Sequence, residues 1–387
     1  MLNPHLAEVP KSCWRFLEAL LGPVSPPRGL DPIHLHMGDP EHAIPAFLME
    51  KIQKHQTDFG AYAPISGIPE LREAIHGWLN RRYCLPPDML DLSTQLLPVA
   101  GLREAMFLIG VVVIPDQKND KTPLVGVPNP FYHSYVGAAV VLGAKPLLLS
   151  ADRENNFLPD LEALEEETLD RLAAVYLCTP SNPQGTTASL EYFQRIIALA
   201  RRHDFVLLVD ECYADIYLDE PPTGVLEACA SLGGDTSNVL AFHSASKRSN
   251  VPGLRSGFVA GDPTLLAQFK TVRDYGGVAI PRPVQVASAA LWNDDEHARI
   301  SRELYRPKFD AAAQIFGNRF GFYLPQGGMF LWLSVNDCVV ATRRLWTEAG
   351  VRVIAGKFMS EKDSDGKYPG QGYIRVALVP DLETTTE

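Results

Sequence analysis

Short runs of hydrophobic residues recur along the middle of the chain and alternate with amphipathic stretches. The runs are rich in Val, Leu and Ile and alternate little with polar residues, which is typical of strands covered on both faces. We predict six such strands, at Leu124–Val127, Lys145–Leu149, Ala173–Cys178, Phe205–Val209, Val239–His243 and Gly257–Ala260. Between two of them, Leu190–His203 has hydrophobic residues at helical spacing. This alternation of strands and helices predicts an α/β fold with a mostly parallel sheet.

The pattern changes near residue 287, where longer helical stretches begin. We predict helices and then strands in this part of the chain, at Val286–Trp292, Ile300–Phe316, Gly321–Leu333 and Tyr373–Leu378. We therefore expect a large domain of residues 41–286 and a smaller α+β domain formed by residues 1–40 and 287–387. In this arrangement the N-terminal segment packs back onto the second domain.

The composition is that of a globular protein with a large core. The chain has 387 residues, of which 46% are hydrophobic and 21% are charged. This length exceeds a single typical core, so two domains are the default expectation. The net charge of −11 argues against nucleic-acid or anionic-membrane partners, because the long-range field repels phosphate groups.

No segment has the pattern of a membrane span or a secretory signal, so we expect a cytoplasmic protein. The six cysteines lack the spacing of a metal site, and we expect buried free thiols at Cys13, Cys84, Cys178, Cys212, Cys229 and Cys338. The neighbouring histidines His34, His36 and His42 lack an accompanying set of Cys or acidic ligands. We therefore expect no metal.

Polar residues follow three of the predicted strands at the point where each strand ends. Asn182 follows the third strand, Asp210 the fourth, and Ser244 and Lys247 the fifth. Ligands of open α/β sheets bind at the carboxyl ends of the strands. We therefore expect these side chains to face one crevice.

The segment FHSASKRSNVPGLRSGF contains the strongest candidate chemistry. Lys247 follows three small residues, and Arg255 lies eight residues further on. Small residues let a bulky group approach the backbone, and hydroxyl groups with a guanidinium suit a phosphate. A lysine near positive charge and partly desolvated has a depressed pKa and becomes a nucleophile toward an aldehyde. The alternative is a solvated basic loop that contains Lys247, Arg248 and Arg255.

Three further segments each allow a functional and a structural reading. Asp210 ends a hydrophobic strand, where it could pair with a protonated ring nitrogen or cap the next helix. Asn182 precedes a proline and could donate to a ligand or stabilise a turn. Gly101 opens the helical segment GLREAM, whose first amides, through Arg103, could contact an anion.

Taken together, the segments resemble the class I and II aminotransferases of the fold type I enzymes that use pyridoxal 5′-phosphate (PLP). The matching blocks keep their order over nearly the whole chain and read YAPISGIPELREAI, GLREAM, VPNPFYHSY, PSNPQG, VDECY, SASKRSNVPGLRSGF, PQGGMFLW and GYIRVAL. The finer resemblance, from NPFYHSY, DECYADIYLDE and LWNDDEHAR, is to N-succinyldiaminopimelate aminotransferases of lysine biosynthesis. Neighbouring subfamilies share most of these segments.

The resemblance implies a role for each matching residue. Lys247 would carry PLP as a Schiff base and move the proton of the substrate, with Asp210 on the pyridine nitrogen and Tyr213 and Asn182 on the ring oxygen. Tyr132 would stack on the ring. The phosphate would be bound by Gly101, Leu102, Arg103, Ser244 and Arg255, and by Tyr62 of the partner subunit in a homodimer. Arg375, assisted by Gly38 and Asn182, would bind the substrate carboxylate.

Two features depart from the family pattern. Leu102 and Arg103 stand where many relatives have a hydroxyl residue, so one phosphate hydrogen bond could be missing. Arg282 has no counterpart in that pattern. We interpret it either as a residue that reads the distal carboxylate of a succinylated substrate or as a surface arginine.

The leading function is therefore amino transfer between N-succinyl-LL-2,6-diaminopimelate and 2-oxoglutarate. The alternatives are an aspartate-, alanine- or acetylornithine-type aminotransferase, a fold type I C–S lyase, and a PLP-binding regulatory protein. The regulatory reading is disfavoured by the acidic charge and by the lack of an N-terminal DNA-binding extension. A dehydrogenase is disfavoured because no GxGxxG segment follows a strand.

Overall fold

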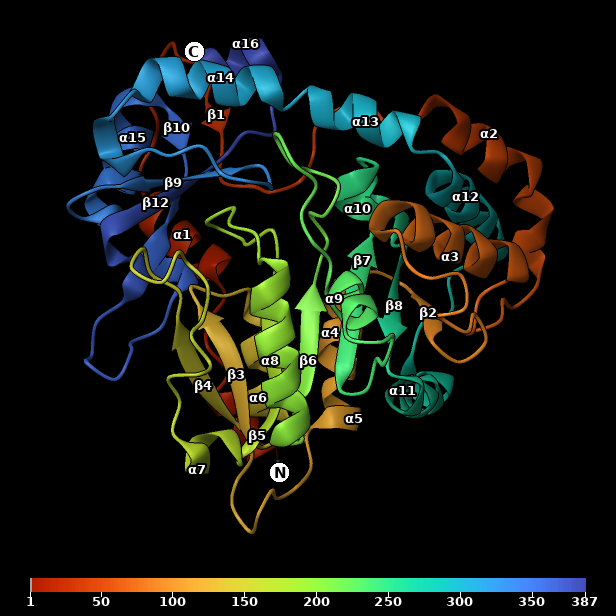
Figure 1. The fold of residues 1–387 in the computed structure, drawn as a ribbon. Coiled ribbons are helices and arrows are strands. Elements are labelled where there is room, and N and C mark those ends of the chain that lie inside the picture. The colour runs from red at the N-terminus through yellow and green to blue at the C-terminus, as the bar shows by residue number, and fades with distance from the viewer. Residues whose placement is uncertain (1) are drawn as a thin grey trace.

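A seven-stranded sheet forms the centre of the larger part of the molecule in the computed structural model, which describes residues 2–387 (Figure 1). The strands, in the order β2-β8-β7-β6-β5-β3-β4 across the sheet, are β2 (Leu96–Val99), β3 (Leu124–Asn129), β4 (Lys145–Ser150), β5 (Leu172–Cys178), β6 (Val206–Asp210), β7 (Val239–Ser244) and β8 (Gly257–Gly261). All six predicted strands are confirmed. The α/β fold expected from the sequence is confirmed as well.

The sheet is mostly parallel, as predicted. Strands β3 to β7 run in the same direction, and only β8 is antiparallel to both of its neighbours, β7 and β2. Strand β2 was not predicted, because it has only four residues and one of them is Pro98. Its position next to β8 is set by distant pairing, in which Leu96 lies opposite Ala260.

Alternate residues of the strands face two helical layers. On β6, Leu207 and Val209 pack into one core cluster, whereas Val206 and Leu208 pack into the other. The first layer comprises α3 (Pro69–Tyr83), α8 (Leu190–Arg202), α9 (Val225–Ser231) and α12 (Arg282–Asn293), and the second comprises α4 (Leu102–Leu108), α5 (Gly110–Val113), α6 (His133–Val141) and α11 (Pro263–Gly276). The carboxyl ends of the parallel strands stay uncovered by these layers, which places the residues after β5, β6 and β7 at one edge.

A second, smaller sheet lies next to this edge (Figure 1). Its antiparallel strands are β11 (Ile354–Ala355), β12 (Tyr373–Ala377) and β9 (Phe330–Ser334), and the helices around it include α14 (Arg306–Phe316), α15 (Cys338–Ala349) and α16 (Leu382–Thr386). The strand expected at Gly321–Leu333 is thus wrong over most of its length, because Gly328 has a positive φ of 82° before β9 begins.

The helix expected at Ile300–Phe316 is divided in two. It consists of the end of α13 (Glu296–Glu303) and the whole of α14, which has Pro307 in its first turn. Proline is compatible with the first turn of a helix but not with its interior, so the chain breaks before it. Figure 1 shows that α13 leads from α12 across to α14 and the smaller sheet.

The N-terminal segment packs against the smaller sheet, as expected. Strand β1 (Ile33–His34) pairs with β10 (Val351–Arg352), and α1 (Cys13–Leu21) buries Leu17 and Leu21 against Trp346. The predicted boundary at residue 287 falls inside α12, which packs on α2 (Ala46–Lys54) and α3 of the larger part. The division into two domains remains a prediction.

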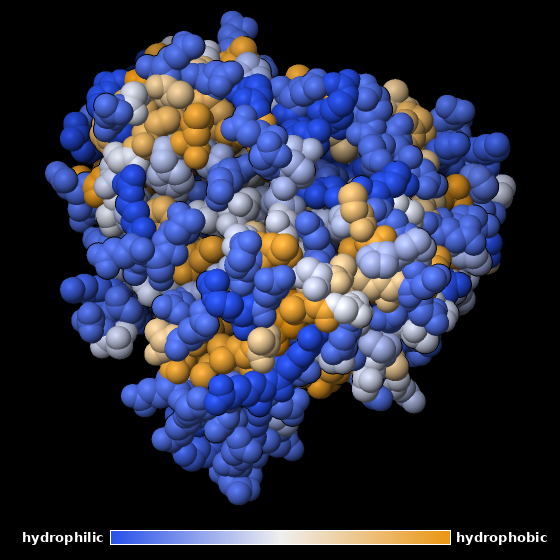
Figure 2. All heavy atoms as spheres, in the orientation of Figure 1, coloured by the Kyte–Doolittle hydropathy of each residue, from blue (hydrophilic) through white to orange (hydrophobic). Residues whose placement is uncertain are grey.

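The surface agrees with the charged composition. Figure 2 shows one face covered mainly by hydrophilic residues, with hydrophobic residues gathered below its middle. Within residues 2–387, no helix combines the length and the hydrophobicity that a membrane crossing requires. All six cysteines are free, as expected, but the expectation that all of them are buried is wrong: only Cys229 and Cys338 are buried, whereas Cys13, Cys178 and Cys212 are partly exposed and Cys84 is exposed. It lies just after α3, where the chain leaves the core.

Candidate active site

Lys247 lies in the short helix α10 (Ala245–Arg248), which follows β7 directly. The hydroxyl of Ser244 caps this helix by accepting a hydrogen bond of 3.1 Å from the Ser246 amide. The Lys247 ammonium donates to the carbonyl of Gly38 and lies 3.1 Å from the Asp39 carboxylate. Its side chain is 15% exposed. The lysine is therefore reachable from outside, but two acceptors from the N-terminal segment bind its amine.

Asp210 is a buried carboxylate at the end of β6. One of its oxygens accepts a 2.7 Å hydrogen bond from the Tyr135 hydroxyl, and the other accepts one of 3.1 Å from the Cys212 amide. Burial raises the pKa of Asp210 above its ordinary value. No Lys or Arg of residues 2–387 forms an ion pair with it. A cationic partner, such as a protonated ring nitrogen, would therefore stabilise its ionised form.

Arg255 and Gly101 form a cradle for an anion. Arg255 donates to the carbonyl of Pro252 at 3.0 Å and to that of Ala100 at 3.4 Å, and no carboxylate of the described chain pairs with it. Gly101 has a φ of +91°, and a Cβ there would lie 1.9 Å from Nη2 of Arg255. Only glycine lets the backbone approach the guanidinium this closely. An incoming phosphate would meet a guanidinium that has no anionic partner.

Arg375 is buried on β12 and joins the smaller sheet to the larger one. It donates to Oδ1 of Asn182 at 2.9 Å and to the carbonyl of His36 at 2.7 Å, while its Nε has no hydrogen-bond partner within residues 2–387. Burial lowers the pKa of its guanidinium. Its centre lies 4.3 Å from the ring of Phe330. A buried guanidinium without a carboxylate partner suits an anionic substrate group.

The ring of Phe330 contacts several of these groups. A Cβ on Gly38 would lie 2.8 Å from its ring, so Gly38 allows the N-terminal segment to cross close to it. The ring of Tyr213 packs edge-on against Phe330 at 5.8 Å between centroids. Burial raises the pKa of Tyr213 well above its ordinary value, so its hydroxyl stays a donor.

Tyr132 and Arg103 meet at the same edge. The Arg103 guanidinium donates through Nε to the Tyr132 hydroxyl at 2.8 Å, and Tyr132 packs edge-on against Tyr135. Several of the predicted residues therefore contact one another in pairs: Lys247 contacts Gly38, Arg375 contacts Asn182, and Arg255 lies against Gly101. The side-chain oxygen of Asn182 accepts from Arg375. The side-chain NH2 group of Asn182 is therefore left to act as the donor that the sequence predicts.

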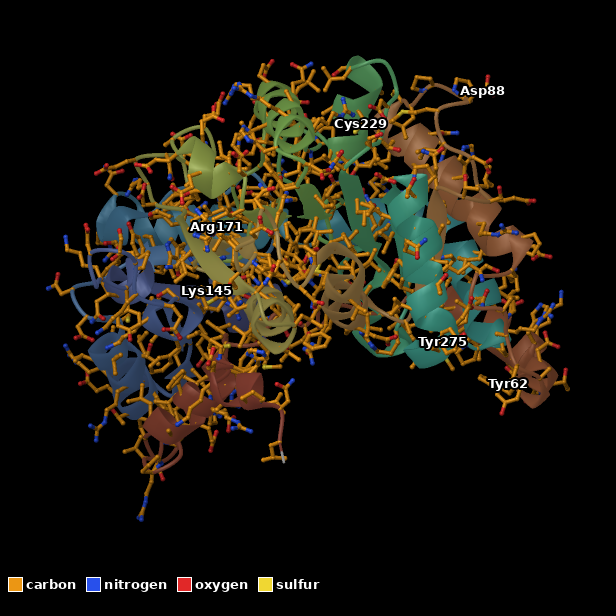
Figure 3. The ribbon with its side chains drawn as sticks, turned by 90° about the horizontal axis from the view of Figure 1, so that it is seen from below. Tyr62, Asp88, Lys145, Arg171, Cys229 and Tyr275 are labelled. Carbon is orange, nitrogen blue, oxygen red and sulfur yellow. The ribbon has the colours of Figure 1, made fainter. Side chains whose placement is uncertain are left out.

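Two predicted residues lie at the surface, away from these contacts. Tyr62 is fully exposed and lies with the exposed Tyr275 at one end of the molecule (Figure 3). Arg282 is exposed at the start of α12. Both side chains are exposed, and their roles stay predictions.

Sequence reasoning missed three residues of the site: Asp39, Tyr135 and Phe330. Tyr135 lies three residues after Tyr132 in the segment FYHSY, and this helical spacing was the available signal. Phe330 lies in the segment PQGGMFLW, which matches the family as a whole block and gives no separate signal for this residue. Asp39 directly follows Gly38, but nothing local indicates that its carboxylate faces Lys247.

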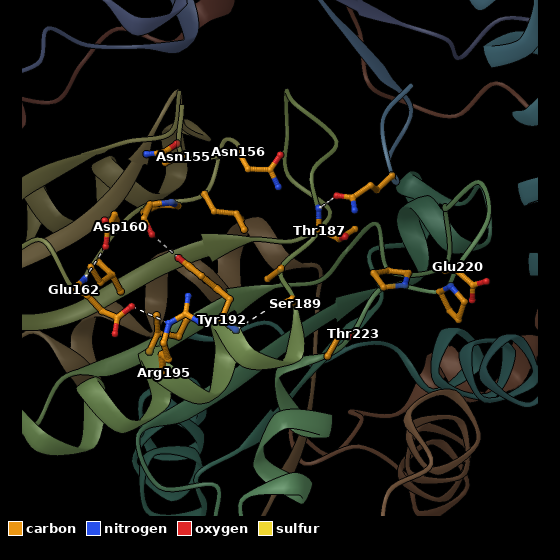
Figure 4. A pocket seen from close by; sticks show the side chains of 18 of the residues that line it. Asn155, Asn156, Asp160, Glu162, Thr187, Ser189, Tyr192, Arg195, Glu220 and Thr223 are labelled. Atoms are coloured by element: carbon orange, nitrogen blue, oxygen red, sulfur yellow. Dashed lines mark hydrogen bonds and ion pairs between the residues drawn. The ribbon is translucent and has the colours of Figure 1, made fainter. Parts of the chain in front are cut away.

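A pocket of about 740 Å³ lies away from these residues. It is lined by residues of several loops and of the start of α8, among them Asp160, Glu162, Thr187, Tyr192 and Glu220 (Figure 4). A separate group of possible metal ligands, Glu166, Asp170 and His203, lies at the opposite edge of the sheet, before β5 and β6. Arg202 already pairs with Glu166 there at 3.2 Å.

The chemistry of the donor set suits one type of ligand. A nucleophilic amine, a buried carboxylate that lacks a cationic partner and a guanidinium that lacks an anionic one fit an aldehyde with a ring nitrogen and a phosphate. Arg375 adds a site for a carboxylate outside this ligand. The arrangement can bind a phosphorylated aldehyde and an amino acid side by side.

Comparison with known proteins points the same way. The family model of aminotransferase class I and II matches residues 31–386. The chain is 31% identical to 4-dedimethylamino-4-oxo-anhydrotetracycline transaminase of Streptomyces rimosus, over 91% of this chain and 90% of the relative. It is 29% identical to LL-diaminopimelate aminotransferase of Nitratidesulfovibrio vulgaris, over 98% and 95%. The crystal structure of an aminotransferase from Neisseria meningitidis matches with a TM-score of 0.94 and 36% identity, over 100% and 97%.

Proposed function

Because the chain belongs to the class I and II aminotransferase family, whose members use PLP, we propose that it transfers the amino group of N-succinyl-LL-2,6-diaminopimelate to 2-oxoglutarate. The enzyme is a PLP-dependent transaminase. The observation that carries the proposal is the buried Arg375 guanidinium, whose Nε has no partner within residues 2–387. Arg375 binds the His36 carbonyl and Lys247 binds the Gly38 carbonyl of the same short segment. Arg375 offers an amino acid carboxylate a charged site next to the reactive amine.

Side chains and amides from several strand ends would hold the cofactor. When bound, PLP supplies an electron-withdrawing ring that makes the proton on the substrate α-carbon removable. Arg255, Ser244 and the amides of the 101–103 turn would bind the phosphate. Asp210 would accept a hydrogen bond from the ring nitrogen, and Asn182 and Tyr213 would donate to the ring oxygen.

Lys247 would perform the two chemical tasks of the chain. Its amine would first bond to the cofactor. Once displaced by the substrate, the amine would take the α-proton as a general base and then, as a general acid, return it to a different carbon atom. For this the ammonium must leave the Gly38 carbonyl and the Asp39 carboxylate. Arg375 would meanwhile hold the substrate carboxylate, and a guanidinium fork fixes its orientation.

The relatives support a substrate with the diaminopimelate skeleton. The succinylated and the free form of this substrate differ in the group at its distal end. Relatives that act as LL-diaminopimelate aminotransferase match nearly the whole chain, which makes free LL-diaminopimelate the second candidate substrate. The exposed Arg282 would read the distal carboxylate of the succinylated form. Arg282→Ala should then raise KM for the succinylated substrate far more than KM for alanine, and equal effects would exclude this role.

We also propose a cytoplasmic homodimer with shared active sites. Tyr62 is fully exposed and has neighbours such as Phe59 that are also exposed, and a partner subunit would cover them. The six free cysteines suit a reducing compartment. A mixed dimer of Tyr62→Phe and Lys247→Ala subunits tests the shared site, because it should contain one site that lacks both side chains and one that lacks neither.

A panel of amino acceptors tests the substrate. Glutamate consumption should be fastest with N-succinyl-2-amino-6-ketopimelate, compared with N-acetylglutamate semialdehyde, oxaloacetate and pyruvate. A parallel assay should measure 2-oxoglutarate-dependent consumption of LL-diaminopimelate. Preference for any other substrate would overturn the proposed one. Pyruvate release from cystathionine without a keto acid would instead support a C–S lyase.

A further inference from the structure

Arg248, the residue after Lys247, is buried and fully bonded. The sequence allowed a solvated basic loop here, but the side chain of Arg248 is only 3% exposed. All five of its N–H groups have acceptors, which are Oδ2 of Asp215 at 2.7 Å, the carbonyl of Leu291 at 2.7 Å, Nε2 of His297 at 3.3 Å, the carbonyl of Asp294 at 3.1 Å and Oδ1 of Asp295 at 2.8 Å. An arginine has five such donors, so none is left over.

Four of the five acceptors belong to the connection between α12 and α13. Leu291 lies near the end of α12, Asp294 and Asp295 form the turn, and His297 lies in the first turn of α13. The Nδ1–H of His297 donates to Asp294 at 2.7 Å, which leaves Nε2 as the acceptor for Arg248. The guanidinium therefore fixes this turn at several points at once.

The next two residues bind the same helix. The hydroxyl of Ser249 lies 2.8 Å from Nε2 of His297, and Oδ1 of Asn250 accepts a 3.1 Å hydrogen bond from Ser301 in α13. Three successive residues after the catalytic lysine thus hold α13. We call residues 248–250 and their partners on α12 and α13 the lysine clasp.

Asp215 and two tryptophan rings also hold the Arg248 guanidinium. Asp215 accepts from both Arg248 and Arg82, and although burial opposes ionisation, the two guanidinium groups hold the pKa of Asp215 below its usual value. The Arg248 guanidinium lies 5.2 Å from the ring of Trp292 and 5.7 Å from that of Trp78. Displacing a buried charge that is paired in this way is costly.

The clasp joins the two sides of the active site. Helix α13 leads into α14, whose Phe309 packs in the same core cluster as Val376, the neighbour of Arg375 on β12 (Figure 1). We propose that Arg248 is a positioning residue that sets the place of the Lys247 amine relative to the smaller sheet carrying Arg375. This inference rests on the proposed role of Lys247.

Arg248→Lys tests the proposal with little change in charge or size. Lysine has three donors and no fork, so it cannot hold Asp215 and the α12–α13 turn together. We expect kcat to fall about tenfold or more, since a misplacement of about 1 Å can cost 10²-fold, whereas KM changes little. We also expect the pH midpoint at which the absorbance of the lysine-bound cofactor changes to move by about 0.5 unit or more.

Arg81→Lys is the matched control. Arg81 donates to Asp295 at 2.8 Å and to the carbonyl of Trp292 at 2.9 Å, so it binds the same turn from α3 without touching α10. The control should lose its own contacts with this turn while keeping kcat and the absorbance midpoint of the wild-type enzyme. Asp295→Asn is a milder second variant, because it leaves the buried Asp215 pair intact, and it should shift the midpoint in the same direction as Arg248→Lys.

The outcomes separate the two proposals. If Arg248→Lys and Asp295→Asn melt at lower temperature but keep the absorbance midpoint and kcat of the wild-type enzyme, the clasp serves stability alone and the inference is wrong. If Lys247→Ala still shows the absorbance of a covalently bound cofactor, the role proposed for Lys247 fails instead. A shift in both clasp variants that is missing from Arg81→Lys supports positioning.

Discussion

The guanidinium of Arg375 donates a 2.9 Å hydrogen bond to the side-chain oxygen of Asn182 and so connects the smaller sheet to the end of β5. The two residues lie 193 positions apart in the chain. The bond leaves the Asn182 amide to face a ligand and leaves Nε of Arg375 without a partner in the described residues. In the proposed function, Asn182 would donate to the cofactor and Arg375 to the substrate, so this contact would join the two binding sites.

Removing the Arg375 fork should impair carboxylate binding specifically. We expect Arg375→Lys to lower kcat/KM for amino acid substrates about 10- to 100-fold, because hydrogen bonds to a charged group contribute about 1.5–3 kcal/mol each. Steady-state kinetics with an amino acid and with an amine that lacks the carboxylate check this. The amine should be affected little, and an equal loss with both would place the carboxylate elsewhere.

Tyr135 should control the ionisation of Asp210. Its hydroxyl stabilises the charged carboxylate, so its removal raises the pKa of Asp210, which burial already raises. In Tyr135→Phe, we expect the acid limb of kcat/KM to move to higher pH by about one unit, because Asp210 would then lose its charge at a higher pH.

Tyr176→Phe is the control for this change. The ring of Tyr176 stacks on that of Tyr135 at 4.7 Å, but its hydroxyl donates to the carbonyl of Met106 rather than to Asp210. It should therefore lose a buried hydrogen bond without moving the pH profile. Identical shifts in the two variants would mean that packing, and not the bond to Asp210, sets the profile.

His42 should make the protein less stable in mild acid. Burial, together with the Lys308 ammonium that donates to its Nε2 at 2.8 Å, lowers the pKa of His42 to about 4. An unfolded histidine titrates near pH 6.5, so the unfolded state takes up a proton first as the pH falls. The contribution of His42 to stability is complete above pH 6.5 and is lost as the pH falls toward about 4.

Denaturant unfolding at pH 7 and pH 5 measures this contribution. We expect His42→Gln to reduce the difference in unfolding free energy between the two pH values, by on the order of 1 kcal/mol. The difference should not vanish, because burial together with Arg352 also lowers the pKa of His36 to about 4.

The sequence predicted the parts of the site that depend on local order. Asp210 and Lys247 directly follow hydrophobic strands, so their place at the carboxyl edge follows from the pattern alone. The partners across the chain were not predictable, since Arg248 meets Leu291 and Asp294 only because α10 packs beside the α12–α13 turn. For the same reason Arg248 resembled a solvated residue in the sequence.

The secondary structure likewise has elements that the sequence pattern predicts and elements that it does not. The hydrophobic strands of the large sheet were predicted because burial on both faces leaves a continuous signal. Strand β2 contains Pro98, where tertiary pairing overrides local preference, so the pattern missed it. The break between α13 and α14 follows the local preference of Pro307, which the hydrophobic spacing alone does not show.

Gly101 should be essential for binding the phosphate. A Cβ at this position would lie 1.9 Å from Nη2 of Arg255, so alanine would push the guanidinium out of the cradle. We expect Gly101→Ala to weaken PLP binding about 100-fold, which is the order expected when a charged hydrogen bond and its geometry are both lost. Titration of the cofactor-free enzyme, followed by fluorescence, measures the dissociation constant.

Gly29→Ala separates this effect from backbone strain. Gly29 has a φ of +88°, close to the +91° of Gly101, but a Cβ there would meet no atom within 4 Å. Both variants pay for a side chain in the left-handed region, and only one of them displaces Arg255. Inorganic phosphate should compete with PLP in the wild-type enzyme and in Gly29→Ala, and should lose this ability in Gly101→Ala. If the two variants bind PLP equally well, the phosphate does not lie between Gly101 and Arg255.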